Sequence, residues 1–592
     1  MRAALCQPPP RSEHRLSDTM QSQQAPPMHP DDYPDIHLPS HLRIAFIHPD
    51  LGLGGAERLV VDAAVALQKR GHDVEIFTSY HEDGEKGRSF EETRNGTLKV
   101  HVLGNSIFPP SILGKFTIVC TMLRQFHLVF SFLLACLLFH LSNIPLLSLF
   151  LAPTDKPFKS SSDWSIRRQL EPFDVIVMDQ LSTCIPILRW FGQSRVVFYC
   201  HFPDLLLASG PHGTSTPHDP RSGRPFSFGN ELRSFYRIPI DLLEEETTGQ
   251  ADKILVNSEF TAQVFARTFQ NLRRIPRVVY PAVDVSQYGG EVQVEEKDKW
   301  MLSDKPTLIS INRFEGKKDI ALAVEAFAKS RATHPNLRLI CAGGYDPRLG
   351  DNVKTLSSLQ QLAAKLELSQ HTYSASELPR VASPVPPRFR PTIANTPPSS
   401  DAAFPDIVFL LNATSSQKSL LLSASHTGTV ALLYTPMFEH FGIVPIEAMA
   451  SGIPVVATET GGPTETVIDK GLPSPDEGDL AESDPRRETT GLLRPRDPAA
   501  WSDALSSLLA LTPSQRATIS SAGRERVKTA FGTDRLGEEL ERACRDAAKR
   551  GYPIPYELGY KKMLAFFGIG AFVGGFGVWA FVTGGVPETA AS

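Results

Sequence analysis

The sequence predicts an α/β protein made of two Rossmann-like domains that face a cleft, followed by a helix that crosses a membrane. Residues 42–285 and 286–532 each alternate short apolar runs with segments of helical periodicity, which is the pattern of repeated β–α–β units. The pattern restarts after a charged stretch at residues 291–299, so the two halves predict separate domains. A chain of 592 residues is also too long for one ordinary domain and suits two or three.

The overall composition excludes several classes of protein. Lys and Arg total 60 against 65 Asp and Glu, and the net charge of −5 argues against a nucleic-acid binder that depends on a broad basic surface. Hydrophobic residues make up 41% of the chain and charged residues 21%, as is typical of globular proteins. The seven cysteines form no C-x-x-C pair, which argues against a structural zinc site or a disulfide framework and favours a reducing compartment.

The first domain opens with a β–α–β unit. Residues 44–47 form a short apolar strand, a glycine-rich turn follows at residues 52–55, and a helical pattern leads to a second strand at residues 74–78. Ser258 is expected to cap a helix over residues 259–269. Further strands are expected at residues 175–178, 196–200, 253–256 and 278–280.

The second domain repeats this pattern with two interruptions. A proline-dense stretch at residues 374–406 has few large apolar residues and predicts an insertion or a disordered loop. Residues 474–487 carry five acidic residues and predict a solvated loop. Strands are expected at residues 307–311, 337–342, 407–411, 431–434 and 453–457, and helices at residues 320–329 and 353–368.

The two ends of the chain are expected to lie outside these domains. Residues 1–41 are rich in Pro, Gln, His and Ser and predict a disordered tail rather than a signal peptide. Residues 533–560 predict a helix and a linker. Residues 563–582 form an uncharged run long enough for a transmembrane helix, and a buried core helix is the alternative. Because Lys561 and Lys562 precede this run, the positive-inside rule places the bulk of the chain in the cytosol.

A second apolar run, residues 125–154, contains no Lys, Arg, Asp or Glu. A clean membrane span is possible over residues 126–141, whereas Pro145 would break a longer helix. A re-entrant or interfacial helix is an equal alternative, and a buried hydrophobic helix pair is the third. The run therefore predicts a membrane-associating segment in the first domain, which either spans or lies in the membrane, with the buried helix pair as the alternative.

The most informative segment, FEHFGIVPIEAMASG, contains two glutamates, Glu439 and Glu447, at a spacing of eight residues. Glu439 falls in a loop after an expected strand, and Gly442 permits a tight turn. Pro445 is expected to open a helix with Glu447 in its first turn. Ionised carboxylates accept several hydrogen bonds, so such a pair can hold sugar hydroxyls. Two glutamates at this spacing are more often a solvated face, but the surrounding glycines and strands favour a binding site.

Two glycines and two cations are expected beside these glutamates. Gly461 and Gly462 precede a helix, where backbone N–H groups and the helix dipole suit a diphosphate. Arg313 and Lys318, in SINRFEGKKDI, follow a strand at the mouth of the cleft, where they can neutralise a departing diphosphate. A basic loop alone is usually plain surface, and the neighbouring Lys317 is an alternative to Lys318.

Further candidates lie in the first domain. Gly54 and Gly55, in GLGGAER, open a helix but lack the third glycine of a dinucleotide-binding fingerprint. Without a Cβ they allow a ligand to approach the backbone closely. His201, in CHFPDLLLA, follows a strand, where it can donate to a sugar hydroxyl, although an isolated histidine is more often a core or surface residue.

These motifs resemble those of the family-4 retaining glycosyltransferases with the GT-B fold, over most of the two predicted domains. The glutamate pair is similar to the Glu-x7-Glu signature of that family, and Arg313 with Lys318 is similar to its Arg-x4-Lys pair. The resemblance implies that Glu439 lies near the donor sugar and that Glu447 binds the nucleotide ribose. It also implies that His201 lies close to the reacting sugar and that the glycine loop approaches the donor phosphates and the acceptor.

A narrower resemblance is to the mannosyltransferases of dolichol-linked oligosaccharide synthesis, and it is carried by HFPDLLLA, YRIPIDLLEEETTGQADKILVNSEFTAQVF, CAGGYDPR and YTPMFEHFGIVPIEAM. It implies GDP-mannose as donor and Man1GlcNAc2-diphosphodolichol as acceptor, with the addition of an α-1,3- and an α-1,6-linked mannose. It also implies a place in protein N-glycosylation, at the cytosolic face of the endoplasmic reticulum membrane. The proline-rich insertion, the acidic loop and the N-terminal tail depart from the family pattern.

Several partners and alternatives complete these expectations. No nucleic acid, cofactor or D-x-D metal motif is expected, and a complex with other early-pathway glycosyltransferases is a further partner to test. One alternative is a transferase of the same family with another nucleotide sugar and a soluble acceptor. The other is a non-catalytic membrane scaffold of the same fold, against which the intact charged motifs argue.

Overall fold

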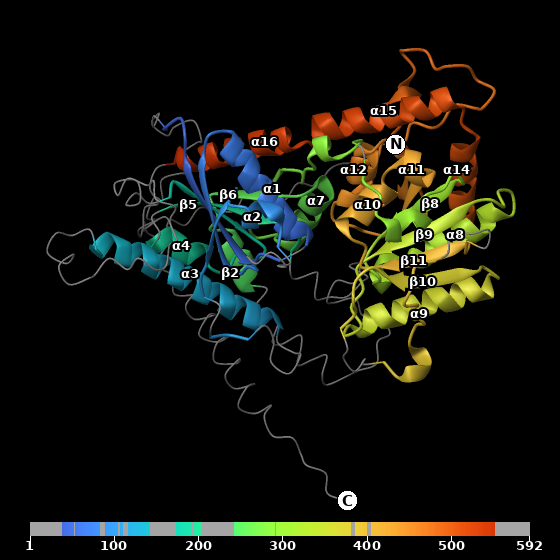
Figure 1. The fold of residues 1–592 in the computed structure, drawn as a ribbon. Coiled ribbons are helices and arrows are strands. Elements are labelled where there is room, and N and C mark those ends of the chain that lie inside the picture. Colours follow the sequence, from blue (N-terminus) through green and yellow to red (C-terminus); the bar gives the residue numbers. More distant parts are fainter. Residues whose placement is uncertain are drawn as a thin grey trace, which may run out of the picture.

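The computed structural model describes the chain as two α/β domains that stand side by side (Figure 1). Each domain is built around a parallel sheet of seven strands, so the predicted two-domain α/β fold is confirmed. The run at residues 563–582, and with it the predicted C-terminal membrane helix, lies outside the described residues. The structure describes residues 38–52, 54–82, 89–104, 107–109, 117–142, 173–191, 194–203, 242–290, 292–379, 385–398 and 404–550.

The N-terminal domain contains a sheet in the order β3-β2-β1-β4-β5-β6-β7. Its strands are β1 (Arg43–Asp50), β2 (Asp73–Tyr80), β3 (Lys99–Val102), β4 (Val175–Asp179), β5 (Arg195–Cys200), β6 (Lys253–Val256) and β7 (Arg277–Val278). The central strands β1, β4 and β5 are buried on both faces, which is why they appear in the sequence as apolar runs. The edge strand β3 was not predicted, because it is short and lacks a buried residue along its length.

The helices with assigned bounds among the described residues of this domain are α1 (Gly55–Lys69), α2 (Glu91–Arg94), α3 (Thr117–Ser142), α4 (Ile185–Phe191) and α7 (Glu259–Thr268). The predicted cap of α7 is confirmed, because the Oγ of Ser258 accepts a hydrogen bond from the N–H of Thr261. Such a cap satisfies one of the four backbone donors that a helix start leaves unpaired.

The C-terminal domain contains a second sheet, in the order β10-β11-β9-β8-β12-β13-β14. Its strands are β8 (Thr307–Ile311), β9 (Arg338–Gly343), β10 (Gln370–Ser374), β11 (Ile407–Leu411), β12 (Thr429–Tyr434), β13 (Val455–Thr458) and β14 (Gly491–Arg494). Its helices are α8 (Ile320–Arg331), α9 (Gly350–Lys365), α10 (Ser415–Leu421), α11 (Ala424–Thr427), α12 (Ile443–Ala450), α13 (Pro463–Thr466), α14 (Pro498–Ala510) and α15 (Pro513–Ala530). The two edge strands, β10 and β14, were not predicted, because neither forms a continuous apolar run.

The start of α12 differs from the prediction. The helix begins at Ile443, with Gly442 as its N-cap at a φ of +87°, and Pro445 is therefore its third residue rather than its first. Proline is tolerated there because the first four N–H groups of a helix have no partner within the helix. Glu447 consequently lies one residue beyond the first turn.

The proline-rich stretch at residues 374–406 packs in part onto the C-terminal domain. A short 3₁₀ turn forms at Pro387–Phe389, and Val385 beside it is buried. The ring of Phe404 stacks on that of Trp300, with their centroids 6.3 Å apart. For the described parts of this stretch, a packed insertion is therefore the better interpretation than a disordered loop.

The last described helix, α16 (Thr533–Ala548), leaves the C-terminal domain and packs on the N-terminal one (Figure 1). Leu536, Leu540 and Cys544 of α16 are buried in the same core cluster as Leu59 and Ala63 of α1. The helix that the sequence predicts after the second domain therefore joins the two domains by packing on the first one.

An acidic side chain on α16 adds a polar contact to this junction. Glu541 pairs with Arg70 of the N-terminal domain, and its Oε1 accepts a hydrogen bond from Arg545 Nε at 2.8 Å. The imidazole of His72 lies 3.4 Å from the same oxygen. Burial opposes the ionisation of Glu541, but the hydrogen bonds from Arg545 and Arg70 lower its pKa to about 2.

We expect Glu541→Gln to lower the melting temperature at neutral pH, and the difference from the wild type to vanish as the pH falls from 4.5 to about 2. A carboxylate with a depressed pKa stabilises the folded state above its unfolded pKa, and this stabilisation is lost as the pH falls through the folded value. Thermal unfolding followed by circular dichroism across this range measures the effect. Glu538→Gln, which removes an exposed pair with Arg542 on the same helix, should change the melting temperature little. A difference that persists in full at the acid end would contradict the prediction.

Helix α3 contains the start of the second apolar run and packs on the N-terminal domain. Leu128, Val129 and Phe132 are buried in the core beneath it, and the side-chain amide of Gln125 donates to the carbonyl of Leu181 at 2.9 Å. One face of this helix is therefore part of the protein core, and residues 143–154 of the run lie outside the described residues.

The opposite face of α3 presents apolar side chains to the surroundings. Phe130, Leu134 and Leu137 follow one another at helical spacing and are 68%, 43% and 53% exposed. Over Cys120–Leu137 the helix is long and apolar enough to cross a membrane, by length and composition only, and one third of that window is buried in the protein. Helix α3 therefore has one face in the protein core and one apolar face exposed.

Candidate active site

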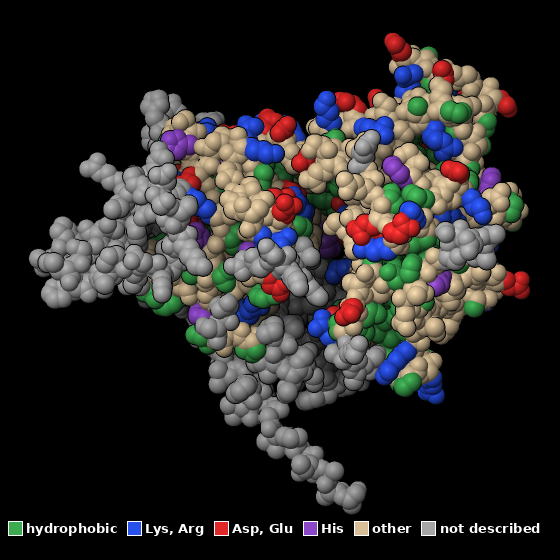
Figure 2. Space-filling view, viewed as in Figure 1, with side chains coloured by type: hydrophobic (Ala, Val, Ile, Leu, Met, Phe, Trp, Pro, Cys, Tyr) green, Lys and Arg blue, Asp and Glu red, His purple; other side chains and the backbone are tan. Residues whose placement is uncertain are grey.

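Charged side chains gather where the two domains meet. Figure 2 shows a furrow between the domains with acidic and basic side chains along both of its rims. In open parallel sheets, ligands bind outside the carboxyl ends of the strands, where the connecting loops converge. The predicted site residues lie on loops or helix starts that follow such strand ends, except Glu447, which lies one residue beyond the first turn of α12.

The first of these loops carries Glu439 and follows β12. The ammonium group of Lys318 forms an ion pair with its carboxylate. Burial opposes ionisation of Glu439, but Lys318 holds its pKa below the ordinary value. The backbone of Lys318 is held as well, because its carbonyl accepts a hydrogen bond from Thr435 Oγ1 at 2.7 Å. The structure therefore brings together two of the residues that the sequence proposed separately.

The two neighbouring cations point elsewhere. Lys317 lies 3.2 Å from Glu315 and is 59% exposed, so it does not replace Lys318 at Glu439. Arg313 also lies 3.2 Å from Glu315, and its guanidinium is 65% exposed at the end of β8. Arg313 is thus available to a ligand in the cleft, although it does not contact Glu439 directly.

The two glycines after β13 shape the Glu439 loop. Gly461 adopts a φ of +71°, and a Cβ on it would lie 2.5 Å from the carbonyl oxygen of Glu439. The N–H of Gly462 donates to that same carbonyl at 2.7 Å. The expectation that this N–H faces a diphosphate is therefore not met in the structure, where it fixes the loop instead. Only glycine leaves room for this close approach of two loops.

Glu447 lies on α12 with one carboxylate oxygen held and the other free. Its Oε1 accepts from Lys418 Nζ at 2.6 Å and from the hydroxyl of Tyr288 at 3.3 Å. Its Oε2 is buried and has no hydrogen-bond partner among the described residues. Burial and the charges of Glu439 and Glu447 all raise the pKa of Tyr434. The two carboxylates therefore lie near the same ring. A buried acceptor without a partner is costly, and ligand hydroxyls would satisfy it.

Sequence reasoning missed Lys418 and Tyr288. Lys418 lies on α10, and Tyr288 follows the 3₁₀ turn Val285–Gln287 in the connection between the domains. No motif marks either residue, and their contact with Glu447 spans 29 and 159 positions. Only the folded chain brings them to this carboxylate.

His201 approaches the site from the N-terminal domain. The ring of the next residue in the chain, Phe202, stacks on the ring of His440, with the ring centroids 3.7 Å apart and the planes 4° from parallel. Ser258 Oγ donates to the carbonyl of His440 at 2.5 Å. Burial lowers the pKa of His440 to about 4, so its ring is neutral at neutral pH. The His201 segment and the Glu439 loop are therefore in contact across the domain boundary.

A second contact holds the domains in this arrangement. The carboxylate of Glu465 on α13 accepts from the N–H groups of Glu259 and Phe260, at 2.7 and 2.6 Å, at the start of α7. The hydroxyl of Tyr280 donates to it at 3.2 Å. Burial raises the pKa of Glu465, although these hydrogen bonds oppose the rise. An acidic residue at a helix start is favourable, and here it comes from the opposite domain.

The glycines of the first loop behave differently from one another. A Cβ on Gly54 would collide with the carboxylate of Glu57, whereas a Cβ on Gly55 would meet no atom within 4 Å. A Cβ on Gly442 would lie 3.0 Å from the ring of Tyr434. The space beside Gly55 is therefore open, whereas Gly54 and Gly442 lie against the side chains of Glu57 and Tyr434. Among the described residues, no group of three or more His, Cys, Asp or Glu could hold a metal ion.

Comparisons with known proteins establish the class. Residues 292–383 and 405–526 match the family model of glycosyl transferases group 1, and residues 139–287 match that of glycosyltransferase family 4. The catalytic domain of starch synthase IV from Arabidopsis thaliana is 13% identical with a TM-score of 0.54, over 86% of this chain and 100% of that one. Sucrose-phosphate synthase from Thermosynechococcus elongatus is 18% identical with a TM-score of 0.51, over 85% and 98%. The protein thus has the fold of the two-domain glycosyltransferases.

Curated relatives establish the particular family. The alpha-1,3/1,6-mannosyltransferase ALG2 of Kluyveromyces lactis is 40% identical over 510 residues, which cover 85% of this chain and 84% of that protein. The protein of that name from Saccharomyces cerevisiae is 37% identical over 504 residues, covering 84% and 83%. The chain belongs to the alpha-1,3/1,6-mannosyltransferase family. The expected enzyme class, a mannosyltransferase, is thereby confirmed.

Proposed function

We propose that this mannosyltransferase transfers mannose from GDP-mannose to Man1GlcNAc2-diphosphodolichol, adding one α-1,3- and one α-1,6-linked mannose. The reaction takes place at the cytosolic face of the endoplasmic reticulum, and its product is used in protein N-glycosylation. The observation that carries the proposal is the Lys318–Glu439 pair close to Glu447, whose second oxygen has no partner among the described residues. A nucleotide sugar supplies both matching groups, a diphosphate for cations and hydroxyls for carboxylates.

In the proposed complex with the donor, each charged residue of the site has its own role. The free Oε2 of Glu447 accepts hydrogen bonds from the ribose hydroxyls, while Lys418 and Tyr288 hold the other oxygen in place. Lys318 and Arg313 face the diphosphate, where Lys318 acts as a point charge and the exposed Arg313 offers a fork of donors. Glu439, which Lys318 keeps ionised, accepts hydrogen bonds from hydroxyl groups of the donor sugar.

Transfer with retention requires attack on the same face as the leaving group. The bond between the anomeric carbon and the diphosphate breaks, and a bond from that carbon to the acceptor oxygen forms. The proton of the acceptor hydroxyl passes to the departing diphosphate. Lys318 and Arg313 stabilise the charge that develops on this diphosphate, and contact between the domains at His440 and Glu465 excludes water.

The direct test is an assay of the detergent-solubilised full chain with GDP-mannose and a Man1GlcNAc2 lipid. We expect two added mannoses, one in α-1,3 and one in α-1,6 linkage, in the presence of a chelator. Transfer from UDP-sugars alone would refute the donor assignment, and transfer to water-soluble sugars alone would favour the soluble-acceptor alternative. We therefore propose that transfer does not need a metal ion, and loss of activity with the chelator followed by recovery with Mg²⁺ or Mn²⁺ would contradict this. No transfer from any nucleotide sugar would favour a scaffold.

We further propose that the exposed face of α3 lies in the membrane surface, and that residues 563–582 anchor the chain beside it. We expect Phe130→Glu to lower the rate on the lipid-linked acceptor in vesicles about tenfold, since an apolar side chain is worth about 1.5 kcal/mol or more when buried. The rate on a water-soluble acceptor analogue should not change. Leu349→Glu, at an exposed apolar position of the C-terminal domain, is the control. Equal rates of wild type and variant on the lipid acceptor would contradict this role for α3.

A further inference from the structure

Two ionisable side chains lie directly behind His201. Asp179 ends β4, His48 lies on β1, and His201 follows the last residue of β5. In the sheet, β4 pairs with β1 on one side and with β5 on the other. Parallel pairing therefore places the three side chains in a row at the carboxyl edge, although neither His48 nor Asp179 belongs to a motif that the sequence marks.

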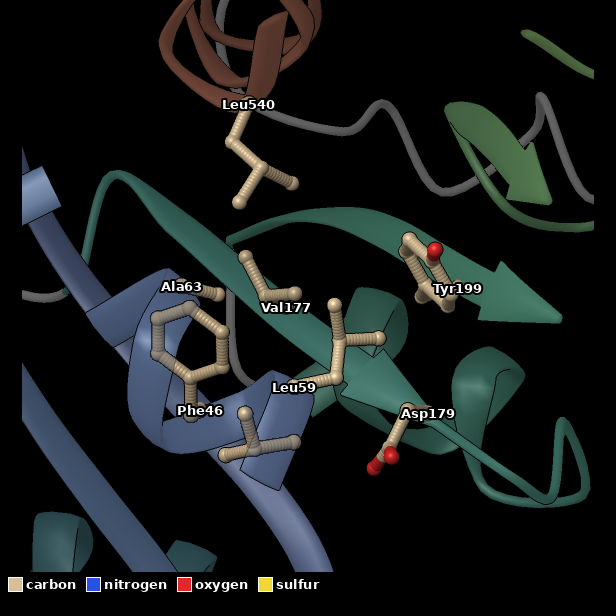
Figure 3. A pocket seen from close by; sticks show the side chains of 8 residues that line it. Phe46, Leu59, Ala63, Val177, Asp179, Tyr199 and Leu540 are labelled. Carbon is tan, nitrogen blue, oxygen red and sulfur yellow. The ribbon is translucent and has the colours of Figure 1, made fainter. Parts of the chain in front are cut away.

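Asp179 uses both carboxylate oxygens to hold the two imidazole rings. His48 Nδ1 lies 2.7 Å from its Oδ1, and His201 Nε2 lies 2.9 Å from its Oδ2. The side chains of His48 and Asp179 are 0% and 4% exposed, whereas that of His201 is 22% exposed. A cavity of about 20 Å³, lined mainly by apolar side chains, adjoins Asp179, whose carboxylate points away from Leu540 (Figure 3). The row thus leads from a buried core position to a ring that the cleft can reach.

The ionisation of Asp179 determines where the protons lie. Burial alone would raise the pKa of Asp179, but the neighbouring His48 and the hydrogen bonds from both histidines lower it to about 2. An ionised carboxylate can only accept hydrogen bonds. Each nitrogen that faces it must therefore carry a proton, which is Nδ1 in His48 and Nε2 in His201. In neutral His201 the remaining nitrogen, Nδ1, is then an acceptor.

We propose that Asp179, itself oriented by His48, is a positioning residue that fixes His201 with its proton on Nε2, so that Nδ1 accepts a hydrogen bond from a sugar hydroxyl during transfer. The inference rests on the proposed function and on the expectation that His201 lies close to the reacting sugar. It reverses the sequence-based expectation that His201 donates to this hydroxyl. The ring of Tyr199, centred 5.1 Å away, and the ring of His440 also lie near His201, and the side-chain amide of Asn257 donates to the carbonyl of His201 at 3.0 Å.

A purely structural role predicts a different outcome. Buried charged groups are often replaceable by apolar groups of similar volume without loss of stability, so packing alone does not require a carboxylate at this position. A positioning role requires that Asp179 act only through His201. The effects of changing the two residues must then fail to add.

The test is a double-mutant cycle in the full-length enzyme, with GDP-mannose and the lipid acceptor. Asp179→Asn is nearly isosteric, but its amide can donate to His201 and favour the wrong tautomer. We expect it to lower kcat about 10- to 100-fold with little change in the KM for GDP-mannose. His201→Ala should lower kcat at least as much, and the double variant should match His201→Ala. The melting temperature of each variant checks that the chain is folded.

A second pair of variants tests His48 without touching Asp179. His48→Asn places an amide N–H close to the position of Nδ1, so it should keep most of the wild-type kcat. His48→Leu fills a similar volume without a donor and should lower kcat by about as much as Asp179→Asn. Equal losses in both His48 variants would overturn the orienting role of this residue.

The outcomes separate this inference from the proposed function. No mannose transfer by the wild type from GDP-mannose would refute the proposed function itself. An active wild type with a fully active Asp179→Asn variant would refute the positioning role alone. Losses in Asp179→Asn and His201→Ala that multiply in the double variant would also refute it, because Asp179 would then act independently of His201.

Discussion

Replacement of Lys318 by alanine should lower kcat for mannose transfer about 100- to 1,000-fold, the range seen when one preorganised group facing developing charge is removed. Lys318 is only 14% exposed and is held on both sides, through its ammonium group by Glu439 and through its carbonyl by Thr435. Its charge therefore stands in place before the diphosphate begins to leave, and no reorganisation is needed. The KM for GDP-mannose should rise less than kcat falls, because the interaction strengthens as charge develops. Steady-state kinetics with radiolabelled GDP-mannose measures both constants.

The adjacent residue provides a matched control. Lys317→Ala removes the same side chain one position earlier, but Lys317 points to Glu315 and is mostly exposed. Its kcat should stay within about threefold of the wild type, since an exposed pair contributes little. If Lys317→Ala were the damaging change and Lys318→Ala the harmless one, the assignment of the two lysines would be wrong.

Replacement of Glu447 by alanine should raise the KM for GDP-mannose about 10- to 100-fold, because a hydrogen bond to a charged group contributes about 1.5–3 kcal/mol. The carboxylate is held by Lys418 and Tyr288 through one oxygen, so the other is oriented before the ligand binds. An interaction made equally in the ground and transition states changes KM more than kcat. Binding of GDP, followed by calorimetry, should weaken by a similar factor.

Two further variants provide an intermediate case and a control for Glu447→Ala. Tyr288→Phe removes only the longer of the two contacts to Glu447 and should raise KM less than Glu447→Ala does. Glu525→Ala, at an exposed position of α15, removes the same charge outside the proposed site and should leave both constants unchanged. A KM for Glu447→Ala equal to that of the wild type would exclude this carboxylate from donor binding.

Local patterns were sufficient for most of the fold. Strands such as β4 and β11 are buried at every position, and a strand buried on both faces must be a continuous apolar run. The helix cap at Ser258 was predictable because its contact with Thr261 is only three positions long. The edge strands β3, β10 and β14 were missed, because partial exposure removes the apolar signal.

The residues of the candidate site likewise fall into those marked by local motifs and those brought together only by folding. Glu439, Glu447 and Lys318 could be proposed from the sequence because each belongs to a motif that is continuous in the chain. His48 and Asp179 were not, since their contact spans 131 positions and each residue alone resembles an ordinary strand residue. The start of α12 was misplaced because the φ of +87° at Gly442, rather than Pro445, sets where the helix begins.

The sequence by itself determined that this protein is a two-domain α/β enzyme with the glutamates and cations of a nucleotide-sugar transferase, because those signals lie in short runs of neighbouring residues. The tertiary structure decided which groups meet: that Lys318 rather than Lys317 reaches Glu439, and that Asp179 stands behind His201. The physical reason is that the direction of a side chain depends on what its backbone packs against. The contact of Lys318 with Glu439 spans 121 positions and that of Asp179 with His201 spans 22, and both form only when the sheets are in place.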